Sequence, residues 1–294
     1  MARPAARLAG NAPGDFYVDD SCIDCAMCRF LAPQVFGREH ARGVSIVAGQ
    51  PEDDAHKMRA AMALVSCPTS SIGSLEKTSV TGAVRALPEA MADGVHFCGF
   101  ASEKSYGASS YWIRREGGNV LVDSPRAAKP LMDRIAEGGG VAILFLSHRD
   151  DVADHAKYRA RFGCERVMHA TDAPRHLGME RLVEGREDAF LADDLRIIPV
   201  PGHTRGSIAL LYKEKFLFTG DHLWGENDAS LGASRSVCWY SWAEQIRSME
   251  RLLDYSFEWV LPGHGAPLHA PSARAMREKL EALIGRMLGE SAHL

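Results

Sequence analysis

The sequence predicts a small α+β domain followed by a larger layered α/β sandwich, and three observations predict this arrangement. Four of the seven cysteines lie at or before residue 67, and three of these four are separated by gaps of two residues. From about residue 95, strands and helices alternate without a strict strand–helix–strand rhythm, which favours a sandwich over a doubly wound parallel sheet. Four loops that follow apolar strands carry histidine or aspartate. We expect a disordered lead-in over residues 1–13, the small domain over 14–82 and the larger domain over 83–294.

Composition and charge limit the classes of function. The net charge of −4 offers no electrostatic footprint for nucleic acid. No stretch approaches the ~20 apolar residues of a membrane span, and the N-terminus lacks the apolar core of a signal peptide. Seven cysteines in 294 residues are too few for a disulfide scaffold. These features predict a cytoplasmic protein whose partner is a small-molecule substrate, with neither nucleic acid nor membrane as a partner.

The small domain reads as two strands and two helices. We expect strands at 15–19 and 44–47, a short helix at 29–35, and a helix that begins after Pro51 and ends near Val65. Proline at the start of a helix, followed by acidic residues, suits the first turn and the helix dipole. A unit of this size builds only a small core, so we expect a bound metal cluster to stabilise it.

The cysteines of the small domain follow an iron–sulfur pattern. Cys22, Cys25 and Cys28 are separated by two residues each, and Cys67 is followed by proline. Bacterial ferredoxins use C-x2-C-x2-C-x3-C-P, and here Ala32 occupies the position of the fourth cysteine. The domain resembles the single-cluster ferredoxins built on a two-cluster frame, which implies one [4Fe–4S] cluster on these four cysteines. A structural zinc site, which usually draws on separated cysteine pairs, and unrelated buried thiols are the alternatives.

The larger domain has strands that end in polar loops. Strands are expected at 111–114, 118–123, 141–146, 165–168, 197–200, 208–212, 216–219 and 259–261, with helices at 131–137, 153–162, 242–253 and 271–288. The polar residues of four loops are His148, Asp150, Asp151, Asp154 and His155 in the first, His203 in the second, Asp221 in the third and His264 in the fourth. Imidazole and carboxylate are the ligand types of zinc and non-haem iron.

The order of these loops resembles the metallo-β-lactamase superfamily, which implies an αβ/βα four-layer sandwich with a dinuclear metal site. Pro-Gly-His203-Thr, Thr-Gly-Asp221 and Pro-Gly-His264-Gly match its later motifs, and Leu-Val-Asp123 matches a structural aspartate. The family's first motif is H-x-H-x-D-H. In this chain an acid, Asp150, replaces the second histidine, and two extra residues precede the Asp-His pair.

The resemblance implies a ligand set for two divalent metals. His148, His203 and Asp150 would form the first site, Asp154, His155 and His264 the second, and Asp221 would bridge them. Asp154 and Asp150 are the predicted catalytic residues. Asp151 is interpreted as the N-cap of the helix that follows, because short acids are strongly preferred at that position, although it remains an alternative ligand.

Two chemistries compete. Asp150 makes the ligand set harder and more anionic, which favours iron, with zinc and manganese as alternatives. A cluster in the same chain favours redox or oxygen chemistry, with electrons from an external donor. If the cluster lies far from the metals within one chain, transfer would occur between the chains of a homodimer. The alternative is zinc-dependent hydrolysis of an ester, thioester, lactam or phosphodiester. A degenerate, non-enzymatic binding module is the least favoured hypothesis.

Overall fold

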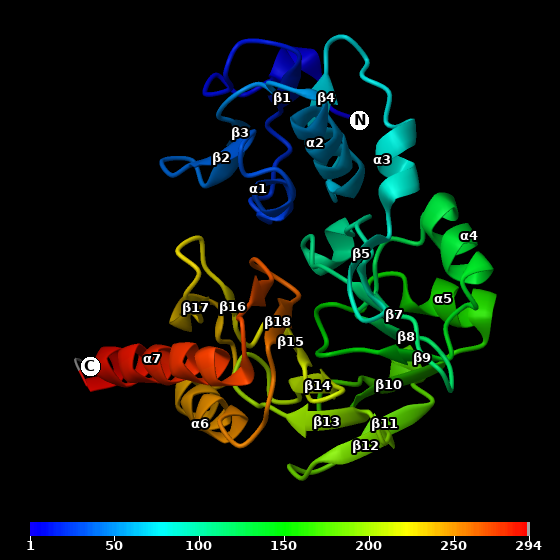
Figure 1. Cartoon of the computed structure of the whole chain (residues 1–294), viewed down its shortest axis with the longest axis vertical. Coiled ribbons are helices and arrows are strands. Elements are labelled where there is room, and N and C mark those ends of the chain that lie inside the picture. The colour runs from blue at the N-terminus through cyan, green and yellow to red at the C-terminus, as the bar shows by residue number, and fades with distance from the viewer. Residues whose placement is uncertain (293–294) are drawn as a thin grey trace. The chain divides into compact units, whose positions relative to one another are not determined.

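The computed structural model describes residues 1–292, and Figure 1 labels their helices and strands. These residues form two compact units. The first unit comprises residues 1–142 and 153–164, and the second comprises residues 143–152 and those from 165 onward. No helix of the described residues has the length and apolar character needed to cross a membrane. Each unit is described by itself below.

The N-terminal part of the first unit has the predicted α+β character. Strand β1 (Phe16–Val18) pairs antiparallel with β4 (Ile72–Ser74), and β2 (Phe36–Glu39) forms a hairpin with β3 (Val44–Val47). Helix α1 (Met27–Leu31) contacts helix α2 (Asp54–Ser66). Asp53 caps α2 by accepting a hydrogen bond from the backbone N–H of His56 at 2.7 Å. Helix α2 ends at Ser66, and the fourth cysteine, Cys67, follows directly as its C-cap.

The expected disordered lead-in is ordered in the structure. Pro4–Ala6 forms a 3-10 helix, and Leu8 is buried. The Asn11 side chain accepts hydrogen bonds from the backbone N–H groups of Val18 and Val47, at 3.0 and 2.9 Å. Residues before position 14 therefore complete the small domain, because a buried leucine and an asparagine that bridges two strands fix the backbone between them.

The rest of the first unit contains an antiparallel meander and three helices. Its strands are β5 (Glu89–Ala92), β6 (Val95–Phe97), β7 (Tyr111–Ile113) and β8 (Val120–Val122), each paired with the next. The helices are α3 (Thr81–Ala86), α4 (Lys129–Glu137) and α5 (His155–Phe162), with a 3-10 turn η2 at Glu103–Ser105. Residues 78–95 thus contain a helix and a strand.

The second unit is built on two groups of strands. Parallel strands β9 (Ile143–Phe145), β10 (Glu165–His169) and β11 (Arg181–Val183) form one group. The other is a six-stranded sheet in the order β12 (Ala189–Ala192), β13 (Leu195–Pro199), β14 (Ile208–Tyr212), β15 (Phe216–Gly220), β18 (Trp259–Pro262), β19 (Leu268–His269). Short strands β16 (Trp224–Gly225) and β17 (Leu231–Gly232) pair with each other, and 3-10 turns lie at η3 (Arg175–Leu177) and η4 (Arg235–Val237).

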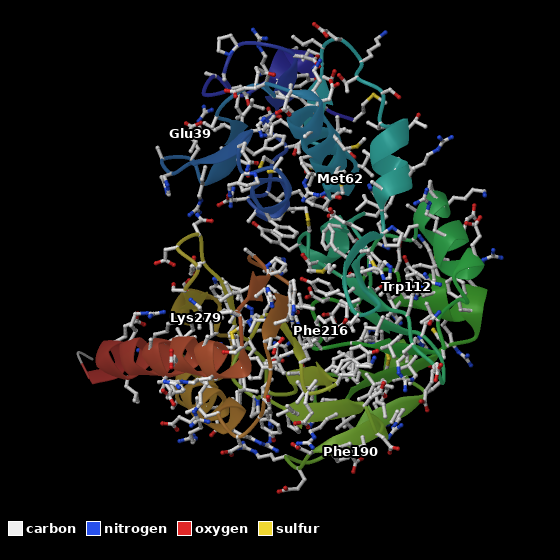
Figure 2. The ribbon with its side chains drawn as sticks, in the orientation of Figure 1. Glu39, Met62, Trp112, Phe190, Phe216 and Lys279 are labelled. Carbon is white, nitrogen blue, oxygen red and sulfur yellow. The ribbon has the colours of Figure 1, made fainter. Side chains whose placement is uncertain are left out.

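Two helices complete the core of the second unit. Apolar side chains of α6 (Trp242–Leu252) and α7 (Ala273–Ala292) share one buried cluster with those of the six-stranded sheet, among them Ile198, Leu217 and Met249. Ser241 caps α6 by accepting from the backbone N–H of Glu244 at 3.3 Å. Phe216 on β15 is fully buried and stacks on Trp259 of β18 (Figure 2).

Strand direction brings the polar loops to one edge. Strands β13 and β15 both run antiparallel to β14, and β18 runs parallel to β15, so β13, β15 and β18 share one direction. The loops after these strands carry His203, Asp221 and His264. The loop after β9, which carries His148, joins them through the hydrogen bond from the Ile208 backbone N–H to the Ser147 carbonyl at 2.9 Å.

Candidate metal centre and cluster site

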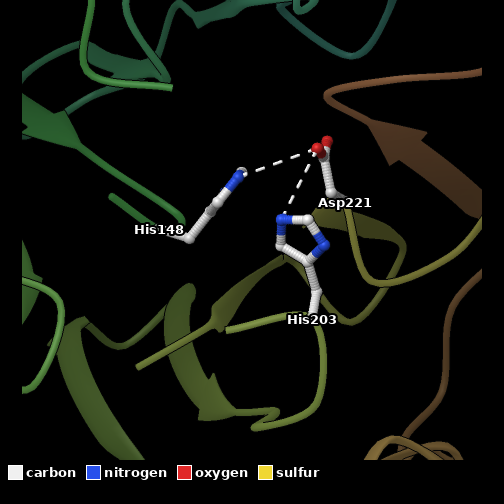
Figure 3. A group of neighbouring side chains, drawn as sticks. All are labelled: His148, His203 and Asp221. Atoms are coloured by element: carbon white, nitrogen blue, oxygen red, sulfur yellow. Dashed lines mark ion pairs between the residues drawn. The ribbon is translucent and has the colours of Figure 1, made fainter. Parts of the chain in front are cut away.

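Two imidazoles and one carboxylate meet at the edge of the second unit. The Nε2 atoms of His148 and His203 lie 3.7 and 3.8 Å from the same oxygen of Asp221, Oδ2 (Figure 3). The two rings are nearly perpendicular, with their centroids 4.8 Å apart. Both histidines are buried. One cation between these three atoms would be within reach of all of them.

The hydrogen bonds of the two histidines use Nδ1 and leave Nε2 available. His203 Nδ1 donates to the Val237 carbonyl at 2.5 Å, and His148 Nδ1 bonds the Ser147 hydroxyl at 2.9 Å. Among the described residues neither Nε2 has a hydrogen-bond partner, although both are buried. With His203 Nδ1 directed at the Val237 carbonyl, its Nε2 faces carboxylate oxygens and needs positive charge there, either a proton or a metal ion. A backbone carbonyl on the outer ring nitrogen is how metal-binding histidines are usually held.

Asp221 also belongs to a second group of potential ligands, with Asp151 and His264. His264 Nδ1 lies 2.8 and 2.9 Å from the two oxygens of Asp221. A Cβ on Gly263 would lie 2.5 Å from an oxygen of Asp151 and 2.8 Å from one of Asp221. Glycine is therefore needed before His264 so that the loop can approach both carboxylates.

Asp150 faces the same imidazoles from the solvent side. It is half exposed, and its Oδ2 lies 3.9 Å from His148 Nε2 and 3.6 Å from His203 Nε2. The interaction with His203 holds the pKa of Asp150 below its usual value, despite opposition from burial. Asp150 therefore offers a charged oxygen to the His148–His203 group at neutral pH.

Burial and neighbouring charges set the ionisation of His148 and Asp221. Burial lowers the pKa of His148 to about 4, against the opposing effect of Asp221. Burial would raise the pKa of Asp221, but the neighbouring imidazoles, His264 foremost, hold it well below the usual range. Neutral imidazole and ionised carboxylate are the forms that bind metals.

The structure does not place Asp154 and His155 in either group of neighbouring ligand atoms formed by the described residues. The Asp154 carboxylate accepts a hydrogen bond from the Ala127 backbone N–H at 3.0 Å and pairs with Lys157 and Lys104 at 3.2 and 3.3 Å. Its place in the second group is taken by Asp151, which is fully buried.

The expected helix cap is also different. Helix α5 begins at His155, after Asp154, so Asp151 lies outside the first turn of the helix. The expected cap at Asp151 is therefore wrong, because Asp154 is the residue that directly precedes the helix.

A buried acid that the sequence analysis did not single out fixes two of the ligand loops. Asp172, just after β10, accepts hydrogen bonds from the Thr204 hydroxyl at 2.5 Å and the Gly206 backbone N–H at 2.8 Å. It also accepts from the backbone N–H of Arg149 at 3.2 Å. The loops that carry His148 and His203 are thereby held to one carboxylate. The available signal was an aspartate three residues beyond the end of a largely buried strand.

The four predicted cluster cysteines line one pocket of the first unit, together with Ser45, Ser71 and Ile72. The Cys22 sulfur accepts from the Ser45 backbone N–H, and the Cys67 sulfur from that of Ser71, both at 3.3 Å. Burial, reinforced by the neighbouring thiols, raises the pKa of Cys25 to about 12. Four thiolates can therefore gather here only around positive charge, which iron would supply.

Comparison with known proteins agrees with this geometry. Residues 18–74 match the model of the 4Fe-4S single cluster domain of ferredoxin I. This range includes all four cysteines and lies within the predicted small domain.

The curated relatives include hydrolases. Over 120 residues the chain is 36% identical to a hydroxyacylglutathione hydrolase of Rhodospirillum rubrum, covering 38% of this chain and 46% of that protein. Over 113 residues it is 37% identical to a protein of the same description from Fuscovulum blasticum, covering 36% and 44%. The chain thus spans about half the length of the curated relatives it matches.

Solved structures define the fold. The B3 metallo-β-lactamase BLEG-1 matches with a TM-score of 0.51 at 16% identity, over 64% of this chain and 99% of that one. TMB-1 matches with a TM-score of 0.51 at 17% identity, over 66% and 96%. The class is therefore that of proteins with a metallo-β-lactamase fold, as the sequence predicted. In this chain the fold is joined to an N-terminal [4Fe–4S] single-cluster domain.

Proposed function

We propose that the chain is a dinuclear metal-dependent hydrolase that cleaves an acyl bond, with a thioester as the first substrate class to test. The observation that carries the proposal is the position of Asp221. One of its oxygens lies within 4 Å of His148 and His203, and the same carboxylate is bonded by His264. A single carboxylate shared by two ligand groups is what a pair of metal ions would need between them.

The chain's own residues divide the work. His148, His203 and Asp150 would hold one metal, Asp151 and His264 the other, and Asp221 both. Bound metals would lower the pKa of a coordinated water and polarise the acyl carbonyl. Asp150 is ionised because His203 lowers its pKa, so it would serve that metal as an anionic ligand at the solvent side of the centre. Asp172 and Gly263 position the loops and keep the ligands close together.

The substrate class rests on the relatives. The matched proteins are described as hydrolases of hydroxyacylglutathione, which carries its acyl group on sulfur. Hydrolysis involves no transfer of electrons from a cofactor. Under this proposal the cluster therefore stabilises the small domain. The observation in favour is that the four cysteines line one pocket with Ser45 and Ser71, in a domain that has only two short strand pairs and two helices.

The test uses the anaerobically purified full chain, loaded in parallel with zinc, iron or manganese. We expect the chain to hydrolyse S-acyl thioesters, at a rate that depends on the loaded metal. The release of free thiol measures this rate. Activity should survive chemical reduction and oxidation of the cluster. Absence of hydrolysis with every metal across esters, thioesters, lactams and phosphodiesters contradicts the proposal.

Redox chemistry is the second candidate, and the three acids at the site favour it. Asp150, Asp151 and Asp221 make an oxygen-rich, anionic ligand set, which suits iron better than zinc. Under this alternative, an external donor would reduce the cluster, and the cluster would supply electrons to the metals. Stopped-flow oxidation of the pre-reduced chain by O2 separates the candidates, because a hydrolase would not couple cluster oxidation to changes at the second metal centre.

A further inference from the structure

A cavity of about 180 Å³ lies in the second unit beside the loop that carries His203. Its wall includes His169, Thr171, Arg186, Pro201, Arg205 and Ser207. None of these side chains belongs to the two metal-ligand groups. We propose that this cavity, the Arg186–Arg205 pocket, binds an oxyanion, either a carboxylate or a phosphate group.

The charges around the pocket favour an anion. Arg205 is exposed and forms no hydrogen bond or ion pair with any residue between 1 and 292 that the structure records. Arg186 pairs through one nitrogen with Glu244 at 2.7 Å, which leaves its other N–H groups available. Glu244 also pairs with Arg247, so this one acid faces both Arg186 and Arg247. Arg205 has no acidic partner among the described residues. Guanidinium groups bind carboxylate and phosphate through paired N–H donors.

The pocket is held in shape by a histidine that carries no charge. His169 Nε2 donates to the Gly185 carbonyl at 3.0 Å, so Nδ1 is the acceptor for the Thr171 hydroxyl at 2.8 Å and the Thr171 backbone N–H at 3.2 Å. This bonding uses both ring nitrogens. His169 therefore fixes the loop that carries Arg186 against the end of β10 and leaves the arginines as the positive groups.

The pocket shares a loop with the metal centre. Pro201, Arg205 and Ser207 line the pocket, while His203 between them faces Asp221. The loop is closed by hydrogen bonds from the Gly202 N–H to the Thr204 carbonyl and from the Thr204 N–H to the Ser207 hydroxyl, both at 3.0 Å. This further step rests on the proposed function: an oxyanion remote from the scissile bond would anchor a substrate beside the metals. The substrate class is then an anionic acyl thioester.

The first experiment measures binding and does not depend on activity. Inorganic phosphate is titrated calorimetrically into the metal-loaded full chain, its Arg205→Gln variant and its Arg247→Gln variant. Arg247 is the matched control because it also contacts Glu244 but does not line the pocket. Any phosphate held by the metals is common to all three proteins. We expect Arg205→Gln to weaken one binding event by at least about tenfold, as loss of a charge-assisted contact predicts, and Arg247→Gln to leave it unchanged.

Equal phosphate affinity in the wild type and in Arg205→Gln would overturn the proposal, as would the absence of a binding event outside the metals.

The second experiment identifies the source of the oxyanion. It compares a thioester whose thiol bears a carboxylate with the matching amide. If Arg205→Gln raises the KM of the carboxylate thioester but not that of the amide, the oxyanion in the pocket belongs to the substrate. Lost phosphate binding with both KM values unchanged assigns the pocket to a free oxyanion. If neither thioester is cleaved, the proposed function fails while the phosphate titration still decides the pocket.

Discussion

His264 contacts Asp221 through two separate groups. Its backbone N–H donates to Asp221 Oδ1 at 3.1 Å, and its Nδ1 lies 2.8 Å from the same oxygen. The backbone contact orients the carboxylate whether or not the imidazole binds a metal. The other oxygen, Oδ2, faces His148 and His203. Asp221 is therefore the one described side chain common to both ligand groups.

Asp221→Asn should disrupt both metal sites together. The amide retains the shape and can still accept from the His264 N–H, but it removes the charge that the two groups share. We expect metal affinity to fall by more than about 100-fold, beyond what loss of an outer partner costs. Competition with a chelator measures the metal affinity of the variant and of the wild type. Retention of one tightly bound metal would show that Asp221 serves a single site.

Asp154→Asn should change stability rather than the metal centre. Burial would raise the pKa of Asp154, but the Ala127 N–H and two lysines lower it below its usual value. An acid with a lowered folded-state pKa stabilises the fold above its unfolded pKa, near 4, and this stabilisation is lost as pH falls through the folded pKa. Because both lysines are exposed, we expect a loss of only about 1 kcal/mol at pH 7.

Urea unfolding of the wild type and Asp154→Asn, at pH 7 and at about pH 3, provides the measurement. The difference between the two proteins should shrink at the lower pH. Asp15→Asn is a useful comparison, since hydrogen bonds from Ser74, Thr78 and Glu76 also lower the pKa of Asp15 against burial. A difference for Asp154→Asn that grows on acidification contradicts the assignment.

Trp239 should contribute to substrate binding. It is 62% exposed, yet its backbone N–H donates to the His203 carbonyl at 2.9 Å and its ring centroid lies 6.3 Å from that of His203. An aromatic ring fixed beside the metal-ligand group offers an apolar surface for an acyl chain. Trp239→Ala is expected to raise KM about tenfold with kcat little changed, since covering part of an indole is worth about 1–2 kcal/mol.

Phe190→Ala is the matched control for Trp239→Ala. Phe190 is an exposed aromatic residue on β12, with 51% of its surface accessible (Figure 2). It should leave both kinetic constants unchanged. Equal effects of the two substitutions would remove the reason to place Trp239 at the substrate.

Ser71 should tune the iron–sulfur cluster. Its hydroxyl lies 3.3 Å from the Cys67 sulfur, and its backbone N–H reaches the same atom. Hydrogen bonds to cluster sulfurs stabilise the more negative, reduced state. Ser71→Ala removes one of the donors around the Cys67 sulfur, while the Ser71 N–H and the Thr69 hydroxyl remain. It should lower the reduction potential, as measured by potentiometric titration monitored by electron paramagnetic resonance. Ser74→Ala loses contacts with Asp15 and with the Thr78 backbone N–H but none with a cysteine, and it should leave the potential unchanged.

The sequence predicted the two-part fold because its signals are local. Cysteine spacing and the order of the Pro-Gly-His and Thr-Gly-Asp loops are visible without long-range contacts. The structure brings His148, His203, Asp221 and His264 together as expected, since β13, β15 and β18 run in one direction.

The choice among the acids of the first loop could not be made from the sequence. Asp151 and Asp154 are both short acids before a helix, and either suits a cap or a ligand. In the structure α5 starts at His155, Asp154 accepts from the Ala127 backbone N–H, far away in the sequence, and Asp151 lies with Asp221 and His264. The role of Asp172 likewise depends on two loops that only the folded chain brings to it.

The metal content of Asp151→Asn, compared with that of Asp154→Asn, tests the central claim most directly. Both proteins are purified anaerobically, and iron, zinc, manganese and acid-labile sulfide are measured per chain. We expect the wild type and Asp154→Asn each to contain about two metals beyond the cluster iron, and Asp151→Asn to lose at least one of them with its sulfide unchanged. Loss of metal from Asp154→Asn, with the full complement retained by Asp151→Asn, would contradict it.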